Sequence, residues 1–168
     1  GIGIIKRADF VRVVIVGDGP MGKRLRSDNP DFHFAGVRTG EDLAAHYASA
    51  DLFVFPSLSE TFGNVTMEAL ASGLAVIAFD YAAAREHIVH GRNGLVADCG
   101  DEHGFREHTL RVARSPRETL KLRAQARQTA ESLSWNHCVD ALERSLIEMA
   151  GTLQPAAPDS TPITAATD

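Results

Sequence analysis

The chain has 168 residues, a formal net charge of −5 and 44% hydrophobic residues, which suits a globular domain with one core of ordinary size. The negative balance and the scattered arginines argue against nucleic-acid binding, and no apolar run reaches the roughly 18 residues of a membrane span. Two cysteines, Cys99 and Cys138, are too few for a disulfide framework, and the first ten residues lack a signal-peptide pattern. We therefore expect a cytoplasmic protein.

Short apolar, β-branched runs recur along the first hundred residues and alternate with helical patterns. Strands are predicted over 11–17, 32–37, 51–56, 74–80 and 94–98, and helices between them over 20–27, 41–49, 64–72 and 82–89. Continuously apolar strands that alternate with helices indicate a parallel sheet covered on both faces. The expected fold is a three-layer α/β/α domain of Rossmann type.

After residue 100 the pattern changes to helices only, which are predicted over 102–114, 116–133 and 135–149. Residues 1–150 would then form the folded domain. The segment 151–168 is small, polar and proline-bearing, so we expect a disordered tail. The first strand comes almost at once, which suggests a fragment whose beginning lies elsewhere.

The segment GDGPMG (17–22) spells G-x-G-x-x-G between a predicted strand and a predicted helix. This pattern is typical of dinucleotide binding, in which an acidic residue about 20 residues further on holds the ribose. Here the next strand is followed by Arg38, and Pro20 removes a backbone donor from the turn. An arginine suits a 2′-phosphate, so an NAD(P)-dependent oxidoreductase is one alternative. The simpler interpretation is a tight turn in which Pro20 begins the helix.

Two glutamates, Glu60 and Glu68, stand eight residues apart where a predicted strand ending at Pro56 gives way to a helix. The carboxyl ends of such strands meet at the ligand crevice of the sheet. A helix opened by Gly63 and Asn64 presents unpaired amides and positive potential, which attract phosphate. Because a carboxylate accepts two hydroxyls at once, each glutamate suits a vicinal diol, and together with the phosphate position they predict a sugar nucleotide. Two glutamates at an arbitrary spacing are more often structural: Glu60 as a solvated loop charge and Glu68 as a residue that favours the N-terminal half of a helix through the dipole.

The residues around these glutamates resemble a known family. The segment SETFGNVTMEALASGLAVIA (59–78) is similar to the E-x7-E signature of retaining glycosyltransferases of family 4, which have the GT-B superfold. Further segments resemble the same family in the same order: VVIVGDGP, FAGVRTGEDLAAHYASADLFVFPS, REHIVHGRNGLVAD and LSW. The resemblance covers residues 11–149 and implies the C-terminal, nucleotide-sugar-binding domain of such an enzyme.

The resemblance also implies roles for individual residues. Glu60 would be the catalytic residue that contacts the transferred sugar, and Glu68 would hold the ribose diol. Backbone groups at the helix start, the first glycine turn and the residues beside the base would complete the donor site: Phe62, Gly63, Asn64, Val65, Gly17, Gly19, Gly36, Val37 and Arg38. The donor would be a UDP- or GDP-sugar, transferred with retention of configuration, without a cofactor or metal ion.

The chain departs from the family in two respects. The arginine and lysine that clamp the diphosphate near the start of the family's domain are not matched in GIGIIKRADF, where Lys6 and Arg7 stand in another pattern. The N-terminal acceptor-binding domain is missing, so we expect this fragment alone to be inactive. The missing half could bind a membrane-lipid acceptor, which would place the enzyme at the inner face of the membrane, and the exposed inter-domain surface favours a homo-oligomer. A non-catalytic nucleotide-sugar-binding module is a further alternative.

Four further polar residues and Asp80 are candidate ligands in the sequence. His87, His90, Cys99 and His103 come closest to a metal cluster, but their spacing fits no standard zinc pattern. Asp80 ends a predicted strand at the crevice, where it suits either ligand contact or capping of the next helix. No metal site is expected.

Overall fold

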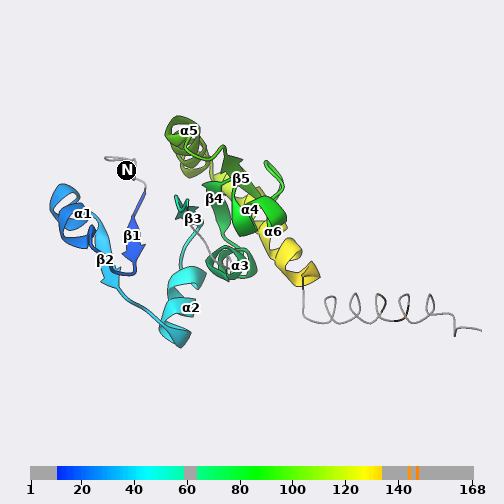
Figure 1. The fold of residues 1–168 in the computed structure, drawn as a ribbon, viewed down its shortest axis with the longest axis horizontal. Helices are drawn as coiled ribbons and strands as arrows, with labels where there is room; N and C mark the ends of the chain where they lie inside the picture. The colour runs from blue at the N-terminus through cyan, green and yellow to red at the C-terminus, as the bar shows by residue number, and fades with distance from the viewer. Residues whose placement is uncertain (1–10, 59–63, 134–143, 145–146, 148–168) are drawn as a thin grey trace, which may run out of the picture. The chain divides into compact units, whose positions relative to one another are not determined.

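The computed structural model describes residues 11–58, 64–133, 144 and 147 of the chain. Strands and helices alternate along it up to β5 (Figure 1). The strands are β1 (Val14–Val16), β2 (His33–Gly36), β3 (Leu52–Phe55), β4 (Ala75–Phe79) and β5 (Gly94–Ala97). The helices are α1 (Gly22–Asp28), α2 (Gly40–Ala48), α3 (Asn64–Ala71), α4 (Ala82–His87), α5 (Glu102–Ala113) and α6 (Pro116–Ser132).

The predicted elements up to residue 133 are all confirmed, with small shifts at their ends. Pro116 is the first residue of α6, as expected for a proline in a first helical turn. Of the predicted helix over 135–149, only Arg144 and Ile147 are described, and both are helical. The predicted tail over 151–168 lies outside the described residues. Contacts divide the chain into two units, Gly1–Ser132 and Leu133–Asp168, and every named element belongs to the first.

The described strands pair in parallel throughout, which confirms the predicted class of fold. β1 pairs with β2, while β4 lies between β3 and β5. These hydrogen bonds define two sheets, β1–β2 and β3–β4–β5, where the sequence pattern suggested one. Periodicity identifies which residues form strands, but it carries no information about which strands become neighbours.

Strand β4 is the centre of the three-stranded sheet, and all five of its residues are buried. One face, with Val76 and Ala78, packs into a cluster with α3, α4 and α6. The opposite face, with Ala75, Ile77 and Phe79, packs into a second cluster with α5 and α6. Helices therefore cover both faces of this sheet, as the unbroken apolar run of β4 predicts.

Helix α6 holds the C-terminal end of α3 through two arginines. Arg123 donates from Nε to the Gly73 carbonyl oxygen at 2.9 Å, and its Nη1 pairs with the Asp51 carboxylate before β3. Arg127 donates from Nη1 to the Ala71 carbonyl oxygen at 2.6 Å. Cationic donors at a helix C-terminus satisfy carbonyls that lack partners within the helix and complement its dipole. The position of α3 is thereby tied to α6 and to the start of β3.

A buried asparagine orders the loop between α4 and β5. Asn93 is 1% exposed, and its Nδ2 donates to the His87 carbonyl oxygen at 2.8 Å and to Thr129 Oγ1 at 2.9 Å. Its Oδ1 accepts from the Val89 amide at 2.8 Å. These three bonds explain why an asparagine stands in the GRNG segment: Asn93 fixes the conformation of the loop.

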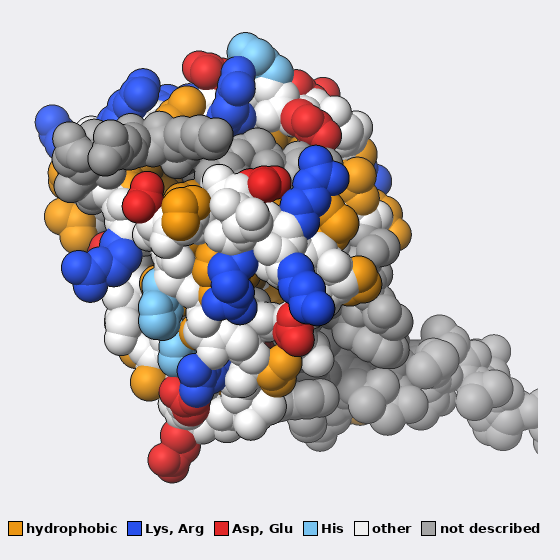
Figure 2. Space-filling model, turned by 90° about the vertical axis from the view of Figure 1, so that its left-hand side faces the viewer, with side chains coloured by type: hydrophobic (Ala, Val, Ile, Leu, Met, Phe, Trp, Pro, Cys, Tyr) orange, Lys and Arg blue, Asp and Glu red, His pale blue; other side chains and the backbone are white. Residues whose placement is uncertain are grey.

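Among the described helices, none combines the length and apolar character needed to cross a membrane. On the face drawn in Figure 2, basic and acidic side chains are interspersed with apolar ones, and neither sign of charge forms a continuous field.

Candidate functional site

Three glycines of the predicted site stand at the carboxyl ends of β1 and β2. Gly17, with φ of 115°, donates its amide to the Gly36 carbonyl oxygen at 2.8 Å, and Gly36 has φ of 75°. Both values lie where side chains are strained, so glycine is required. Among the described residues, no atom lies within 4 Å of a Cβ built at Gly17, Gly19 or Gly36. The structure thus brings Gly17 and Gly36 together, and no described residue crowds the backbone at these glycines.

The residues that follow β2 are exposed. Val37 is 69% exposed, and Arg38 donates from Nη1 to Asp42 Oδ2 at 3.0 Å. At the position predicted to lie beside the nucleotide base, the Val37 side chain is therefore exposed to solvent. The Arg38 guanidinium is hydrogen-bonded to Asp42 in the first turn of α2.

The glycine-rich turn after β1 differs in detail from the expectation. Helix α1 begins at Gly22, with Met21 as its N-cap residue, so Pro20 precedes the helix instead of starting it. The turn is closed by a bond from the Gly22 amide to the Gly19 carbonyl oxygen at 2.9 Å, and Asp18 Oδ1 accepts from the Gly19 amide. The Gly19 amide is therefore already bonded to Asp18, and helix α1 starts at Gly22, two residues after the predicted start at Pro20.

The second part of the predicted site lies on α3. Asn64 is its first residue, as the sequence predicts, and both Asn64 and Glu68 are exposed while Val65 is half-buried. The first turn of α3 has no acidic side chain. Its leading amides lack partners within the helix and carry the positive end of the dipole, which suits an anion. Glu60, Phe62 and Gly63 lie outside the described residues, so their predicted roles remain predictions.

Beneath this exposed face, Thr66 is fully buried. Within the described part of the chain its hydroxyl oxygen has no hydrogen-bond partner. A buried hydroxyl in that state carries a desolvation cost of about 1–3 kcal/mol.

Tyr47 is a neighbour of Glu68 that the sequence pattern does not indicate. Tyr47, in the last turn of α2, interacts with Glu68, and its pKa is raised to about 12 by burial, by the negative charge of Glu68 and by a side-chain hydrogen bond with it. The Tyr47 ring lies 5.7 Å from that of Phe53 in β3. In the sequence, Tyr47 is marked only as an aromatic residue near the end of a predicted helix. Most aromatic residues in such positions simply pack into the core, so the sequence does not indicate a contact with Glu68.

Asp80, at the end of β4, does not cap the helix that follows. The N-cap residue of α4 is Tyr81, without a side-chain capping bond, and Asp80 instead pairs with Arg85 Nε at 3.3 Å. Arg85 also donates from Nη2 to the Asp80 carbonyl oxygen at 2.7 Å. The capping interpretation is therefore wrong, and the carboxylate is held by an arginine of α4.

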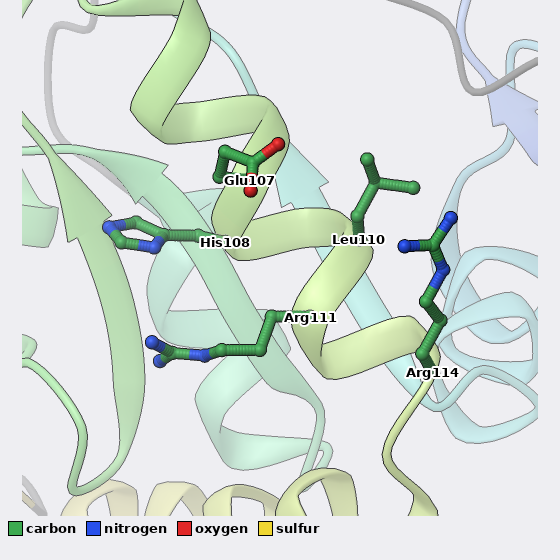
Figure 3. A pocket seen from close by; sticks show the side chains of 5 residues that line it. All are labelled: Glu107, His108, Leu110, Arg111 and Arg114. Carbon is green, nitrogen blue, oxygen red and sulfur yellow. The ribbon is translucent and has the colours of Figure 1, made fainter.

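A hollow of about 430 Å³ lies on α5, away from the predicted site residues in sequence. Its described lining comes from that helix and its C-cap residue Arg114, with His108 and Arg111 extending on one side and Arg114 on the other (Figure 3). Burial, and then the positive charges of His90 and Arg111, lower the pKa of His108. A hollow lined by a single helix encloses no ligand, and we do not regard it as the functional site.

Metal ligands do not gather in the described part of the chain. There, no group of three or more histidine, cysteine, aspartate or glutamate residues could hold an ion. Cys99 is an exposed free thiol.

Comparison with known proteins identifies the family. A sequence model of the family described as "Glycosyl transferases group 1" matches residues 2–115. A GDP-mannose-dependent alpha-mannosyltransferase of Mycobacterium tuberculosis is 42% identical over 134 residues, which make up 79% of this chain and 34% of that protein. The chain belongs to the group 1 glycosyl transferase family, and it spans about a third of the length of this curated relative.

Solved structures agree on the fold. The C-terminal domain of a group 1 glycosyl transferase family protein, LpcC, from Francisella tularensis matches 73% of this chain and 69% of its own, with a TM-score of 0.64 and 21% identity. The pneumococcal O-GlcNAc transferase GtfA, in complex with UDP and GlcNAc, matches 83% of this chain and 30% of its own, with a TM-score of 0.66 and 22% identity. The chain thus has the fold of the C-terminal, Rossmann-like half of a GT-B glycosyltransferase.

Proposed function

We propose that this chain is the donor-binding domain of a glycosyltransferase that takes a sugar from a nucleoside-diphosphate sugar. Glu68 would accept the ribose hydroxyls, and the first amides of α3 would face the diphosphate. Glu60 would contact the transferred sugar, and the backbone of Phe62 and Gly63 would complete the phosphate site. The relatives' donors support this class of ligand, because one similar protein is named for GDP-mannose and another structure holds UDP.

The observation that carries the proposal is the exposure of Glu68 on α3, a helix whose first turn has no acidic side chain and whose C-terminal end is occupied by an arginine. Arg127 satisfies a carbonyl at the C-terminal end of α3, at Ala71. The first turn holds no acidic residue that would compete with phosphate. Glu68 lies about one turn from Asn64, so a ligand with a diphosphate and a diol matches the chemistry of this face.

The chemistry of such a site is electrostatic. Cleavage of the bond between sugar and diphosphate places negative charge on the departing nucleotide. Prearranged amides and the positive end of a helix dipole stabilise that charge without reorganisation at the moment of reaction. The residues of this chain would therefore bind the leaving group and orient it. Retention of configuration and the lack of a metal ion are what the resemblance to family 4 glycosyltransferases implies.

Donor binding is one half of the reaction. Transfer requires donor and acceptor held together in a cleft from which water is excluded. We propose that residues 1–150 form the donor half, followed by the tail over 151–168, and that an acceptor-binding domain completes the enzyme in the cytoplasm or at the inner face of the membrane. A lipid acceptor and self-association are compatible with this arrangement.

The direct test of the Glu68 assignment is the variant Glu68→Ala. Removal of hydrogen bonds to a charged acceptor costs about 1.5–3 kcal/mol, so binding of UDP or GDP should weaken about tenfold or more. Titrations followed by NMR or calorimetry measure this change. Glu107→Ala, which removes an exposed glutamate from α5, serves as the matched control and should leave the affinity unchanged. Equal affinity of the protein and Glu68→Ala would overturn the assignment.

A further inference from the structure

Strands β1 and β3 are both edge strands. β1 is paired with β2 and β3 is paired with β4, in parallel, and no other described strand is hydrogen-bonded to either of them. A single sheet of the same strands would have two edges, whereas the two sheets together have four. An uncovered edge offers unpaired backbone groups to another strand, and proteins usually pair or cover it.

The hydrogen bonds show which backbone groups face the open sides of β1 and β3. The carbonyl oxygen of Asp51 accepts from the first amide of β4 at 3.0 Å, and that of Val13 accepts from the first amide of β2 at 3.0 Å. Backbone groups of successive residues in a strand point to opposite sides. Those of Val14 in β1, and those of Leu52 and Val54 in β3, therefore face away from the paired strand.

The side chains of both strands are those of interior strands, yet they are incompletely covered. Val14 and Val16 are 43% and 39% exposed, and Val54 is 41% exposed. Phe53 and Phe55 stack at 5.5 Å between ring centroids and are only half-buried. In a parallel sheet with helices on both faces, continuously apolar strands such as these are buried. An apolar neighbour would cover these side chains.

The order of the strands indicates what kind of neighbour fits. One common order of a doubly wound parallel sheet is 3-2-1-4-5-6, numbered along the chain, and another is 2-1-3-4-5. The second order requires β1 to pair with β3, and in the described part of the chain these two strands are not paired. The first order matches when one further strand, earlier in the protein than β1, lies between β1 and β3.

The similar proteins contain enough additional sequence for such a strand. The match covers 34% of the Mycobacterium tuberculosis mannosyltransferase and 69% of the LpcC domain structure. A parallel strand that precedes β1 also needs a crossover of about a dozen residues or more, which is usually a helix.

We propose that the full-length enzyme supplies one further parallel strand from outside residues 1–168, and that this strand pairs with β1 on one side and β3 on the other. The two sheets then form one sheet in the order β2-β1-X-β3-β4-β5, where X is the inserted strand. Gly17 follows β1 and α3 follows β3, so the inserted strand also sets the spacing between these two parts of the candidate site. Only this last consequence rests on the proposed function.

Amide hydrogen exchange, measured by NMR without nucleotide on residues 1–168 and on the full-length enzyme, tests the inserted strand. Val14, Leu52 and Val54 have outward-facing amides, and Ile15 and Phe53, whose amides face the paired strands, are the matched controls. In residues 1–168 we expect the outward amides to exchange about tenfold or more faster than the controls. In the full-length enzyme both groups should exchange at similar rates.

Three results would overturn the proposal. Similar rates for both groups in residues 1–168 would mean that this chain closes its own edges, for example by direct pairing of β1 with β3. Fast outward amides in the full-length enzyme would mean that the edges stay open. Protection of residues 1–168 that rises with protein concentration would assign the edges to a second copy. Because no nucleotide is present, none of these results depends on the proposed function.

The variant Val54→Pro provides a second measurement, because it removes one outward amide of β3. Proline is tolerated on an edge strand where the missing N–H would face solvent, and it disrupts a strand that is paired on that side. We expect Val54→Pro to lower the melting temperature of the full-length enzyme by several degrees and that of residues 1–168 much less. Equal losses in the two proteins would contradict the proposal, since the outward amide would then have the same surroundings in both.

Discussion

Arg123 in α6 donates a hydrogen bond from Nε to the carbonyl oxygen of Gly73, 50 residues earlier in the chain, at 2.9 Å. Gly73 has φ of 69° and forms the turn that leads from α3 into β4. The same guanidinium pairs with Asp51, which precedes β3. One side chain therefore fixes the exit of the helix that carries Glu68 and the entry to the neighbouring strand.

The loss of this guanidinium should destabilise the domain. Arg123→Met keeps an apolar stem but removes the bond to Gly73 and the ion pair with Asp51, and because the side chain is 29% exposed we expect a loss of about 1–2 kcal/mol in the free energy of unfolding. Urea unfolding measures the change. Lys121→Met, at an exposed position of the same helix, is the control and should stay within about 0.5 kcal/mol of the unmodified protein. Similar losses in the two variants would show that the Gly73 bond contributes nothing specific.

Ala82 begins α4 with φ of 46°, and among the described residues it alone combines a side chain with a positive φ. A left-handed backbone costs a residue with a Cβ about 1–2 kcal/mol, and glycine avoids this cost but loses about 0.5–1 kcal/mol through its greater freedom when unfolded. Ala82→Gly should therefore stabilise the domain by about 0.5–1 kcal/mol, as measured by thermal or urea unfolding. At exposed Ala45 within α2, the same substitution should be destabilising by about 0.5–1 kcal/mol. A loss at both positions would contradict the strain at Ala82.

His108 should make the stability of the domain depend on pH. Burial, and then the charges of His90 and Arg111, lower its pKa, while Asp101 and a backbone hydrogen bond with Val96 act in the opposite direction. The unfolded chain then binds the proton more tightly than the folded one, so stability is lost as pH falls through the ordinary histidine range towards the lower, folded-state value. Unfolding at pH 7.5 and 5.5 should show a smaller acid-induced loss in His108→Gln than in the unmodified protein. An equal or larger loss in the variant would show that the proton binds equally well or better in the folded state.

Glu60 should act on the sugar and not on the nucleotide. In the full-length enzyme, Glu60→Ala should depress sugar transfer while the affinity for bare UDP or GDP changes little, since Glu60 precedes the phosphate-binding end of α3. Turnover and nucleotide binding are measured on the same preparation. A loss of bare-nucleotide affinity as large as that of Glu68→Ala would mean that the two roles are misassigned.

The sequence predicts the elements of this fold well and their long-range contacts poorly. The start of α3 at Asn64 follows from local chemistry, as does the burial of β4 on both faces, because each depends on neighbouring residues. The pairing of Tyr47 with Glu68 joins residues 21 positions apart on different helices, and the bond from Arg123 to Gly73 spans 50. Such contacts depend on how helices pack against the sheet, and periodicity does not specify that packing.

The same distinction applies to the site. Gly17 and Gly36 were predicted as members of one site from a family resemblance, and the bond between their backbones places them together. Pro20 was predicted to begin α1, but the closure of the turn between Gly19 and Gly22 delays the helix. A turn of this kind is decided by a hydrogen bond that several sequences can form, so the residue types alone do not locate the first helical residue.

Binding of a nucleoside diphosphate at α3 is tested by an NMR titration of the isotopically labelled protein with UDP, GDP and NADP. The basic pair that clamps the diphosphate in the family is unmatched in the sequence, so we expect dissociation constants of about 1 mM or weaker, which correspond to about −4 kcal/mol. We expect UDP or GDP to shift the amide signals of Asn64, Val65 and Glu68 together with that of Gly17, and we expect no such shifts with NADP. Shifts caused by NADP around Gly17–Gly22, with α3 unaffected by UDP and GDP, would contradict it and favour a dinucleotide-binding domain.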